Sequence, residues 1–107
     1  MKIKLTNIFK KSFKKLSKKD RFLISQYENL IKDLEYNPIL GTQISDGVYK
    51  IRLKNKSNNK GKSAGYRVIT YTKIENIILL VHIYSKSDRE SILDKYIDEI
   101  IKNYRLD

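Results

Sequence analysis

The spacing of the apolar residues changes at Pro38, the only proline in the chain. Before it, apolar residues recur every three or four positions in two successive runs, which is the period of an amphipathic helix. The first run contains Phe9, Phe13 and Leu16, and the second contains Leu23, Tyr27, Leu30 and Leu34. Thr6 is suited to capping the first helix, and the run Ser17 to Asp20 has the spacing of a capping box that would start the second. Because proline disfavours helical geometry at the residue before it, the second helix should end at Asn37.

After Pro38 the pattern becomes that of strands. Residues 48–53 alternate apolar and basic side chains, and residues 65–73 and 77–84 are rich in β-branched and aromatic ones. The last of these segments is apolar on both faces, so it should lie inside the sheet rather than at its edge. Loops are expected at residues 41–47, 55–64 and 74–76.

The two ends of the chain complete the predicted fold. Residues 2–5 alternate and are expected to form an edge strand, and the segment after residue 88 carries apolar residues at helical spacing. These residues are Ile92, Leu93, Tyr96, Ile97, Ile100 and Ile101. The predicted order is therefore β-α-α-β-β-β-α within a single domain, residues 1–107. This is an α+β fold, in which the N-terminal helical hairpin packs on one face of a mainly antiparallel sheet and a helix ends the chain.

The composition excludes several classes of chemistry. The chain has no cysteine and one histidine, which excludes disulfides, cysteine-based zinc sites, iron–sulfur clusters, thiol nucleophiles and any mechanism needing two histidines. The C-terminal acidic residues are spaced for surface ion pairs, so we expect no metal and no cofactor. The longest apolar run, residues 77–81, is too short to span a membrane. Because no export signal is recognisable either, we expect a soluble, cytoplasmic protein.

Positive charge is concentrated in the middle of the chain. The formal net charge is +11, and residues 47–74 contain no acidic residue. The basic residues of this segment are Lys50, Arg52, Lys54, Lys56, Lys60, Lys62, Arg67 and Lys73. Such a one-sided field is typical of a protein that binds a polyanion, and nucleic acid is the first candidate. The alternative is a solvated lysine-rich surface that reflects the codon usage of an AT-rich genome.

Three segments of the second half carry a family resemblance. They are Tyr49-Lys50-Ile51-Arg52-Leu53, Gly61-Lys62-Ser63-Ala64-Gly65-Tyr66-Arg67-Val68-Ile69 and Ile83-Tyr84-Ser85-Lys86-Ser87-Asp88. With the preceding helical hairpin and its Asn-Pro turn, they resemble the RelE/ParE superfamily of bacterial toxins, and in particular its HigB-like branch. The chain departs from the family pattern at Ala64, where a second glycine is common, and in its longer loop of asparagine and lysine.

The resemblance implies the toxin of a type II toxin–antitoxin system. RelE-type members enter the ribosomal A site and cut mRNA, and a cognate antitoxin, commonly a helix-turn-helix or acidic protein, binds and silences them. Two alternatives stay open. One is a ParE-like toxin that poisons gyrase, although such proteins generally lack clustered cations on the strands, and the other is an RNA-binding module without catalysis.

The chemistry of RNA cleavage sets requirements that the strand cations can meet. Attack of the 2′-hydroxyl on the adjacent phosphate develops negative charge and needs a base and an acid. Lys50, Arg52 and Lys54 alternate along one strand, so they share one face and lie about 7 Å apart along it. Because clustered cations disfavour one another's charged forms, one lysine could act as the base while an arginine stays protonated.

The resemblance also assigns roles to individual residues. It implies catalytic or phosphate-binding roles for Lys50, Arg52, Arg67 and Lys86, with Arg67 stabilising the charge of the transition state. Lys54 and Lys62, with Lys56 and Lys60 between them, would bind flanking phosphates, and Tyr66 or Tyr84 would stack on a base, unless these tyrosines pack in the core. The catalytic tyrosine that RelE-like enzymes commonly carry falls at Leu93 or its neighbours, with Tyr96 one helical turn further. The general acid and base are therefore left open, and His82 is expected to be structural.

Overall fold

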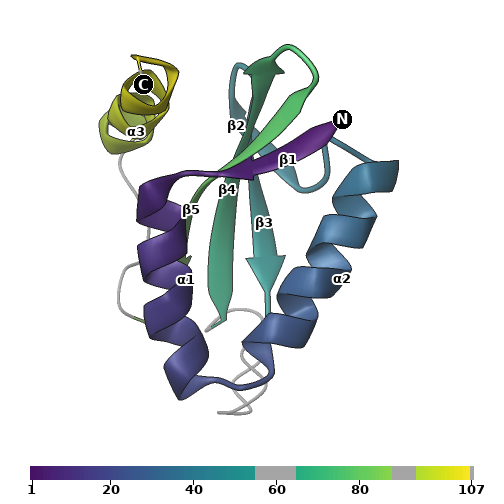
Figure 1. Ribbon diagram of the computed structural model, residues 1–107, viewed down its shortest axis with the longest axis vertical. Helices are drawn as coiled ribbons and strands as arrows, with labels where there is room; N and C mark the ends of the chain where they lie inside the picture. The colour runs from purple at the N-terminus through teal and green to yellow at the C-terminus, as the bar shows by residue number, and fades with distance from the viewer. Residues whose placement is uncertain (55–64, 88–93, 107) are drawn as a thin grey trace.

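The computed structural model describes residues 1–54, 65–87 and 94–106, which form three helices and five strands (Figure 1). In chain order the elements are β1 (Lys2–Leu5), α1 (Asn7–Lys19), α2 (Leu23–Tyr36), β2 (Thr42–Ser45), β3 (Val48–Leu53), β4 (Tyr66–Ile74), β5 (Ile77–Ser85) and α3 (Asp94–Leu106). The predicted loop at 55–64 and the start of the last helix, with Ile92 and Leu93, lie outside the described residues.

The five strands form one sheet in the order β1-β5-β4-β3-β2. β1 runs parallel to β5, and every other neighbouring pair is antiparallel. As predicted from its apolar sequence, β5 lies inside the sheet, and its residues are buried from Ile78 to Ser85. As also predicted, β1 lies at an edge. The α+β class is therefore confirmed.

One strand was missed by the sequence patterns. The segment expected to be a loop, residues 41–47, contains β2, so the order becomes β-α-α-β-β-β-β-α. β2 pairs with the first half of β3, and Gly47 takes a left-handed backbone conformation (φ 73°) in the turn between them. The sequence of β2, Thr-Gln-Ile-Ser, has one apolar residue, because a short edge strand exposes most of its side chains. It therefore carries too little alternation to be recognised.

The caps of the helical hairpin differ in part from the prediction. Thr6 caps α1, and its hydroxyl accepts a hydrogen bond from the backbone N–H of Phe9 at 2.9 Å. The predicted capping box is wrong, because α1 continues through Ser17 to Lys19. Asp20 instead makes the turn into α2: its N–H donates to the carbonyl of Leu16, and its carboxylate accepts from the N–H of Phe22 at 3.0 Å. α2 ends before Asn37, as predicted.

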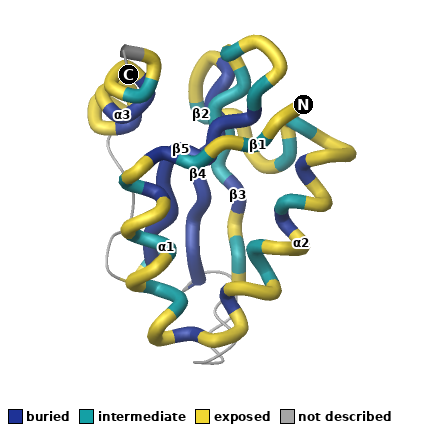
Figure 2. Tube along the Cα trace, in the orientation of Figure 1, coloured by how far each residue is buried: buried dark blue, intermediate teal, exposed yellow. Residues whose placement is uncertain are grey.

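The helices cover opposite faces of the sheet. On one face α1 and α2 bury a cluster that includes Phe9, Leu30 and Ile83, and on the other α3 buries a cluster that includes Val48 and Ile97. Figure 2 shows the result, since β5 and the first half of β4 are buried while β3 changes between buried and exposed residues. β3 therefore presents side chains of the sheet to solvent, as do the edge strands β1 and β2.

A bulge in β5 changes which residues face α3. Ile69 pairs with His82, and the next residue of β4 pairs with Leu80, so Val81 is skipped. After the bulge the alternation of β5 is reversed: Leu80 and Ile83 both pack under the hairpin, while Val81 and Tyr84 pack on the α3 face. The hydroxyl of Thr6 donates to the carbonyl of Val81 at 2.7 Å. The bulge is thus fixed from the start of α1.

Candidate active site

Three predicted side chains form a row across the sheet. Arg52 of β3 lies directly opposite Arg67 of β4, and Arg67 lies directly opposite Tyr84 of β5. Directly paired residues project from the same face of a sheet, with Cβ atoms about 5 Å apart. Arg52, Arg67 and Tyr84 therefore form one continuous surface, called the arginine row below. It lies on the α3 face, because Tyr84 packs in the cluster of that face.

A second row runs beside the first. Lys50 is paired with Ile69, which is paired with His82. Lys50 is half-buried, and the strands that carry Lys50 and His82 are about 10 Å apart. The ring of His82 lies 5.9 Å from that of Tyr84. Two rows of the same face thus bring ammonium, guanidinium, phenol and imidazole groups into one neighbourhood.

α3 leaves only the Arg52 end of the arginine row uncovered, because it packs towards the other end of the sheet, and Arg67 and Tyr84 are nearly buried. It packs over Val48, at the start of β3, whereas Arg52 lies near the end of that strand. Figure 1 shows α3 at the top of the molecule and the end of β3 at the bottom. Arg52 is accordingly exposed. The face that carries the cations is therefore open at Arg52, the exposed end of the arginine row.

Arg67 is a nearly buried cation, with 4% of its surface exposed. Its Nη1 donates to the carbonyl of Tyr66 at 3.2 Å. Burial lowers the pKa of Arg67, the charge of Arg52 lowers it further, and Tyr84 acts in the opposite direction. A guanidinium nevertheless stays protonated in proteins. Two like charges directly opposite in a sheet destabilise it, and an anion bound between them would remove that cost.

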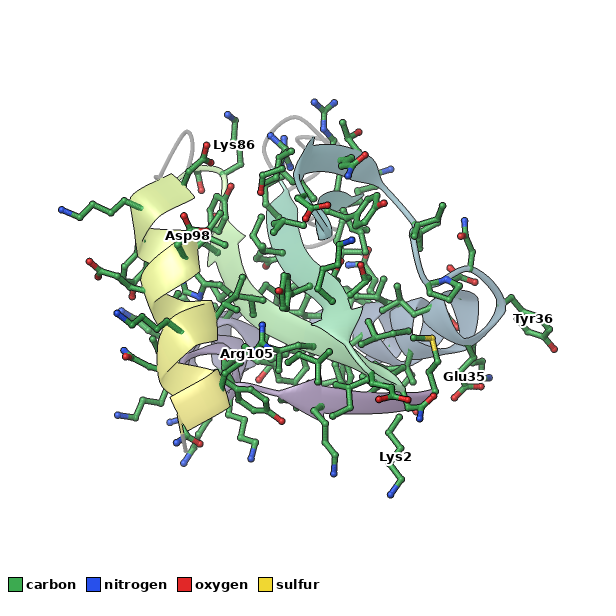
Figure 3. The ribbon with its side chains drawn as sticks, turned by 90° about the horizontal axis from the view of Figure 1, so that it is seen from above. Lys2, Glu35, Tyr36, Lys86, Asp98 and Arg105 are labelled. Atoms are coloured by element: carbon green, nitrogen blue, oxygen red, sulfur yellow. The ribbon has the colours of Figure 1, made fainter. Side chains whose placement is uncertain are left out.

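Two other predicted cations lie near the arginine row. Lys54 follows β3 and is exposed, and its backbone carbonyl accepts a hydrogen bond from Gln26 Nε2 of α2 at 2.6 Å. Lys86 follows β5, and its backbone N–H donates to the carbonyl of Gly65 at 2.8 Å. Figure 3 shows the side chain of Lys86 pointing outward beside the first turn of α3. The other predicted lysines, Lys56, Lys60 and Lys62, lie outside the described residues.

Tyr66 does not lie with the other predicted residues. It projects from the opposite face of β4, is 2% exposed, and packs in the cluster under the helical hairpin. Its hydroxyl donates to the carboxylate of Asp20 at 2.9 Å. Burial, the hydrogen bond to Asp20 and the charge of that carboxylate all raise the pKa of Tyr66. Of the two tyrosines expected to stack on a base, only Tyr84 lies on the face of the arginines.

His82 is the residue of this neighbourhood that sequence reasoning left out of the site. It is 7% exposed, and its ring contacts Tyr84 and, edge to face at 6.0 Å, Tyr96 of α3. The signal was its spacing of two from Tyr84, which places both side chains on one face of a strand. That spacing does not show which face the two side chains share, because the bulge at Val81 determines whether they lie on the α3 face or under the hairpin.

The groups gathered here are suited to an anion. Guanidinium, ammonium, phenol and imidazole groups all donate hydrogen bonds, and charged donors bind phosphate oxygens strongly. Within residues 1–54, 65–87 and 94–106, no three His, Cys, Asp or Glu side chains are grouped as metal ligands would be. In the same part of the chain, no helix is both long and apolar enough to cross a membrane.

The comparison with known families extends over nearly the whole chain. A family model described as the RelE toxin of the RelE/RelB toxin–antitoxin system matches residues 1–104. No curated protein matches closely enough to count as a relative. The matched range includes the arginine row, the second row and Lys86.

Proposed function

Because this chain belongs to the RelE family of toxins from toxin–antitoxin systems, we propose that it is a ribosome-dependent endoribonuclease. It cuts mRNA in the ribosomal A site and thereby stops translation in the cytoplasm. An antitoxin protein of helix-turn-helix or acidic type binds and silences it. The observation that supports a nuclease is the arginine row, in which two guanidinium groups and a phenol share one face of the sheet that is open to solvent at Arg52.

The reaction we propose needs no metal. The 2′-hydroxyl of one nucleotide attacks its own 3′-phosphate, and the bond to the 5′-oxygen of the next nucleotide breaks. One product ends in a 2′,3′-cyclic phosphate and the other begins with a 5′-hydroxyl. The nonbridging oxygens gain negative charge in the transition state, and Arg52 and Arg67 are placed to donate hydrogen bonds to them. Arg67 is the stronger contributor because electrostatic interactions are less screened where water is largely excluded.

The same proposal assigns the remaining side chains. Lys50 and His82 are the candidates for the groups that take and give the proton, since each lies in the row beside the arginines. Lys86 stabilises the phosphate from the end of β5, and Tyr84 stacks on a base. Lys54 binds a flanking phosphate, as do Lys56, Lys60 and Lys62, which we assign on sequence grounds alone.

The test is cleavage of a defined mRNA on purified ribosomes. We expect the wild-type protein to cut within the reading frame, and both Arg67→Ala and Lys50→Ala to cut at least about 100-fold more slowly. Arg67→Ala removes a donor to the developing negative charge, and Lys50→Ala removes a candidate for proton transfer. The matched control is Lys73→Ala, which removes a cation from the far half of β4. Lys73 is exposed and pairs with Asp46 at 3.4 Å. Thermal unfolding of each variant shows whether it still folds.

Other results would contradict the proposal in distinct ways. Intact mRNA together with inhibited DNA supercoiling would favour a gyrase poison. Tight binding of RNA without any cleavage would favour a non-catalytic module. Undiminished cleavage by both Arg67→Ala and Lys50→Ala would show that the reaction takes place elsewhere on the protein.

A further inference from the structure

A groove runs along the part of β5 that β1 does not reach. β1 pairs with residues 77–80 of β5, and in the described part of the chain no strand pairs with that edge beyond Leu80. α1 lies beside this free edge (Figure 1). The space between them, called the α1–β5 groove below, has a volume of about 630 Å³. Its polar lining includes Ser12, Lys15 and Lys19 of α1 and His82, Tyr84 and Ser85 of β5, and Tyr66 of β4 also lines it.

The α1 wall of the groove is strongly basic. α1 contains Lys10, Lys11, Lys14, Lys15, Lys18 and Lys19 and no acidic residue. Of these, Lys15 and Lys19 line the groove. They are exposed and lie one helical turn apart, about 6 Å along the helix axis. None of the described lining residues is acidic. Two cations in series, with hydroxyl groups around them, form a wall that suits successive phosphates of one strand.

The groove adjoins the arginine row at one shared residue. Tyr84 belongs to both, because it is paired with Arg67 and also lines the groove. In a polymer bound with one phosphate at Arg67, the neighbouring phosphates on one side would therefore lie in the groove. A single RNA strand fits this path, since its backbone is anionic at every step and its bases can stack on aromatic rings such as that of Tyr84.

We propose that the α1–β5 groove is a second subsite for the RNA strand, which binds the phosphates on one side of the cleavage point through Lys15 and Lys19. This inference rests on the proposed nuclease function and deepens it. The arginine row alone would bind one phosphate. With the groove, the protein would bind several successive phosphates of an extended single strand. Substrates extended on the groove side therefore bind more tightly than short ones.

The test uses the full chain and single-stranded RNAs that are fully 2′-O-methylated, so that the attacking hydroxyl is blocked and only binding is measured. The RNAs are a dinucleotide and two longer series, extended either on the 5′ side or on the 3′ side. The test variant is Lys15→Ala/Lys19→Ala. The matched control, Lys14→Ala/Lys18→Ala, removes two exposed lysines with the same spacing from the same helix, outside the groove. Both variants relieve the same repulsion between lysines one turn apart.

We expect the test variant alone to lose affinity. Loss of two phosphate contacts on a single strand should reduce the slope of log K against log salt by about 1.4. This change is expected in one of the two extended series and not with the dinucleotide. Equal losses in the test and control variants would overturn the proposal, because they would reflect net charge rather than the groove. It would be overturned equally by a loss that is the same for the dinucleotide, or by no detectable binding to the wild type.

Three further outcomes distinguish an RNA subsite from other roles of the groove. If the test variant loses affinity for an acidic antitoxin but keeps its affinity for RNA, the groove is a protein site and the proposal fails. If the wild type cuts mRNA on ribosomes while test and control variants bind RNA alike, the groove proposal fails and the nuclease stands. If the wild type does not cut mRNA, the proposed function fails and the groove is not a substrate subsite.

Discussion

At the scale of single residues, the pairing of Arg52 with Arg67 destabilises the fold but is suited to binding an anion. They are directly opposite in the sheet, and one of them is nearly buried. Like charges in this position destabilise the folded state by about 0.2–1 kcal/mol. The arrangement fits the anionic ligand proposed above, because such a ligand would turn the repulsion into two favourable contacts.

Replacement of Arg52 should therefore separate stability from activity. We expect Arg52→Gln to raise the free energy of unfolding by about 0.5 kcal/mol, since the repulsion with Arg67 is removed. Cleavage of mRNA on ribosomes should fall at the same time. Denaturant unfolding and the cleavage assay measure the two effects, and Lys32→Gln, on the exposed side of α2, is the control. A variant that is both less stable and fully active would contradict this account of the pair.

The buried tyrosine on the other face makes a prediction about pH. Burial and the neighbouring Asp20 raise the pKa of Tyr66 above its ordinary value of 10.0. Because the folded state favours the neutral phenol, this contribution to stability is complete below pH 10 and is lost as the pH rises above it. The loss is about 1.4 kcal/mol per pH unit while Tyr66 ionises only in the unfolded state.

The variant Tyr66→Phe isolates this effect. We expect its free energy of unfolding at pH 7 to be lower by about 1 kcal/mol, because the hydrogen bond to Asp20 is lost. Between pH 9 and 11 it should lose stability less steeply than the wild type. Denaturant titrations at several pH values measure both slopes, and parallel curves for the two proteins would contradict the assignment.

At the scale of elements, one threonine links a helix cap to the bulge of β5. The hydroxyl of Thr6 accepts from Phe9 in α1 and donates to the carbonyl of Val81. The bulge in turn places Tyr84 on the face of the arginines. The start of α1 therefore helps to position a residue of the arginine row, although the two are far apart in sequence.

Thr6→Val keeps the shape of the side chain and removes both hydrogen bonds. We expect the free energy of unfolding to fall by about 0.5–2 kcal/mol, the range measured for lost helix caps. Thr6→Ser keeps the hydroxyl and should lose less than half as much. Cleavage should follow stability in the serine variant and fall further in the valine variant, because Tyr84 is less well held. Equal behaviour of the two variants would exclude a role for the hydroxyl.

The same elements show how far the sequence predicted the site. The alternation of β3 correctly placed Lys50 and Arg52 on the face opposite Ile51. It could do so because one side of that strand is polar. β5 is apolar on both sides, so its sequence shows no alternation of polar and apolar residues. The bulge at Val81 therefore could not be predicted from it. The faces of His82 and Tyr84 therefore became known only from the register. Tyr66 was ambiguous for the same reason, since a buried tyrosine and a stacking one look alike in sequence.

At the scale of the whole molecule, the family could be predicted although no single motif identifies it. The order of the helical hairpin, the basic strand and the two apolar strands indicated a RelE/ParE-type toxin, and the match to the RelE family over residues 1–104 confirms this. The HigB-like branch stays a prediction. The excess of positive charge, +11 in 107 residues, is consistent with a polyanionic partner.

A charge of this size should make the proposed binding to ribosomes sensitive to salt. We expect the affinity to fall steeply with rising salt, and the slope of log K against log salt to decrease by about one in Lys54→Ala, which removes one phosphate contact. Lys102→Ala, on α3, removes the same charge far from the arginine row and should leave the slope unchanged. Co-sedimentation at several salt concentrations measures both. An affinity that does not depend on salt would exclude phosphate contacts.

The parallel pairing of β1 with β5 has a consequence for how the protein is made. A ribosome releases the chain from its N-terminus, so β1 emerges first and finds no partner until most of the chain has been translated. Tyr84, which completes the arginine row, emerges equally late. Pairings between such distant segments form last during folding. We therefore expect a chain whose translation stops before β5 to lack the proposed nuclease activity.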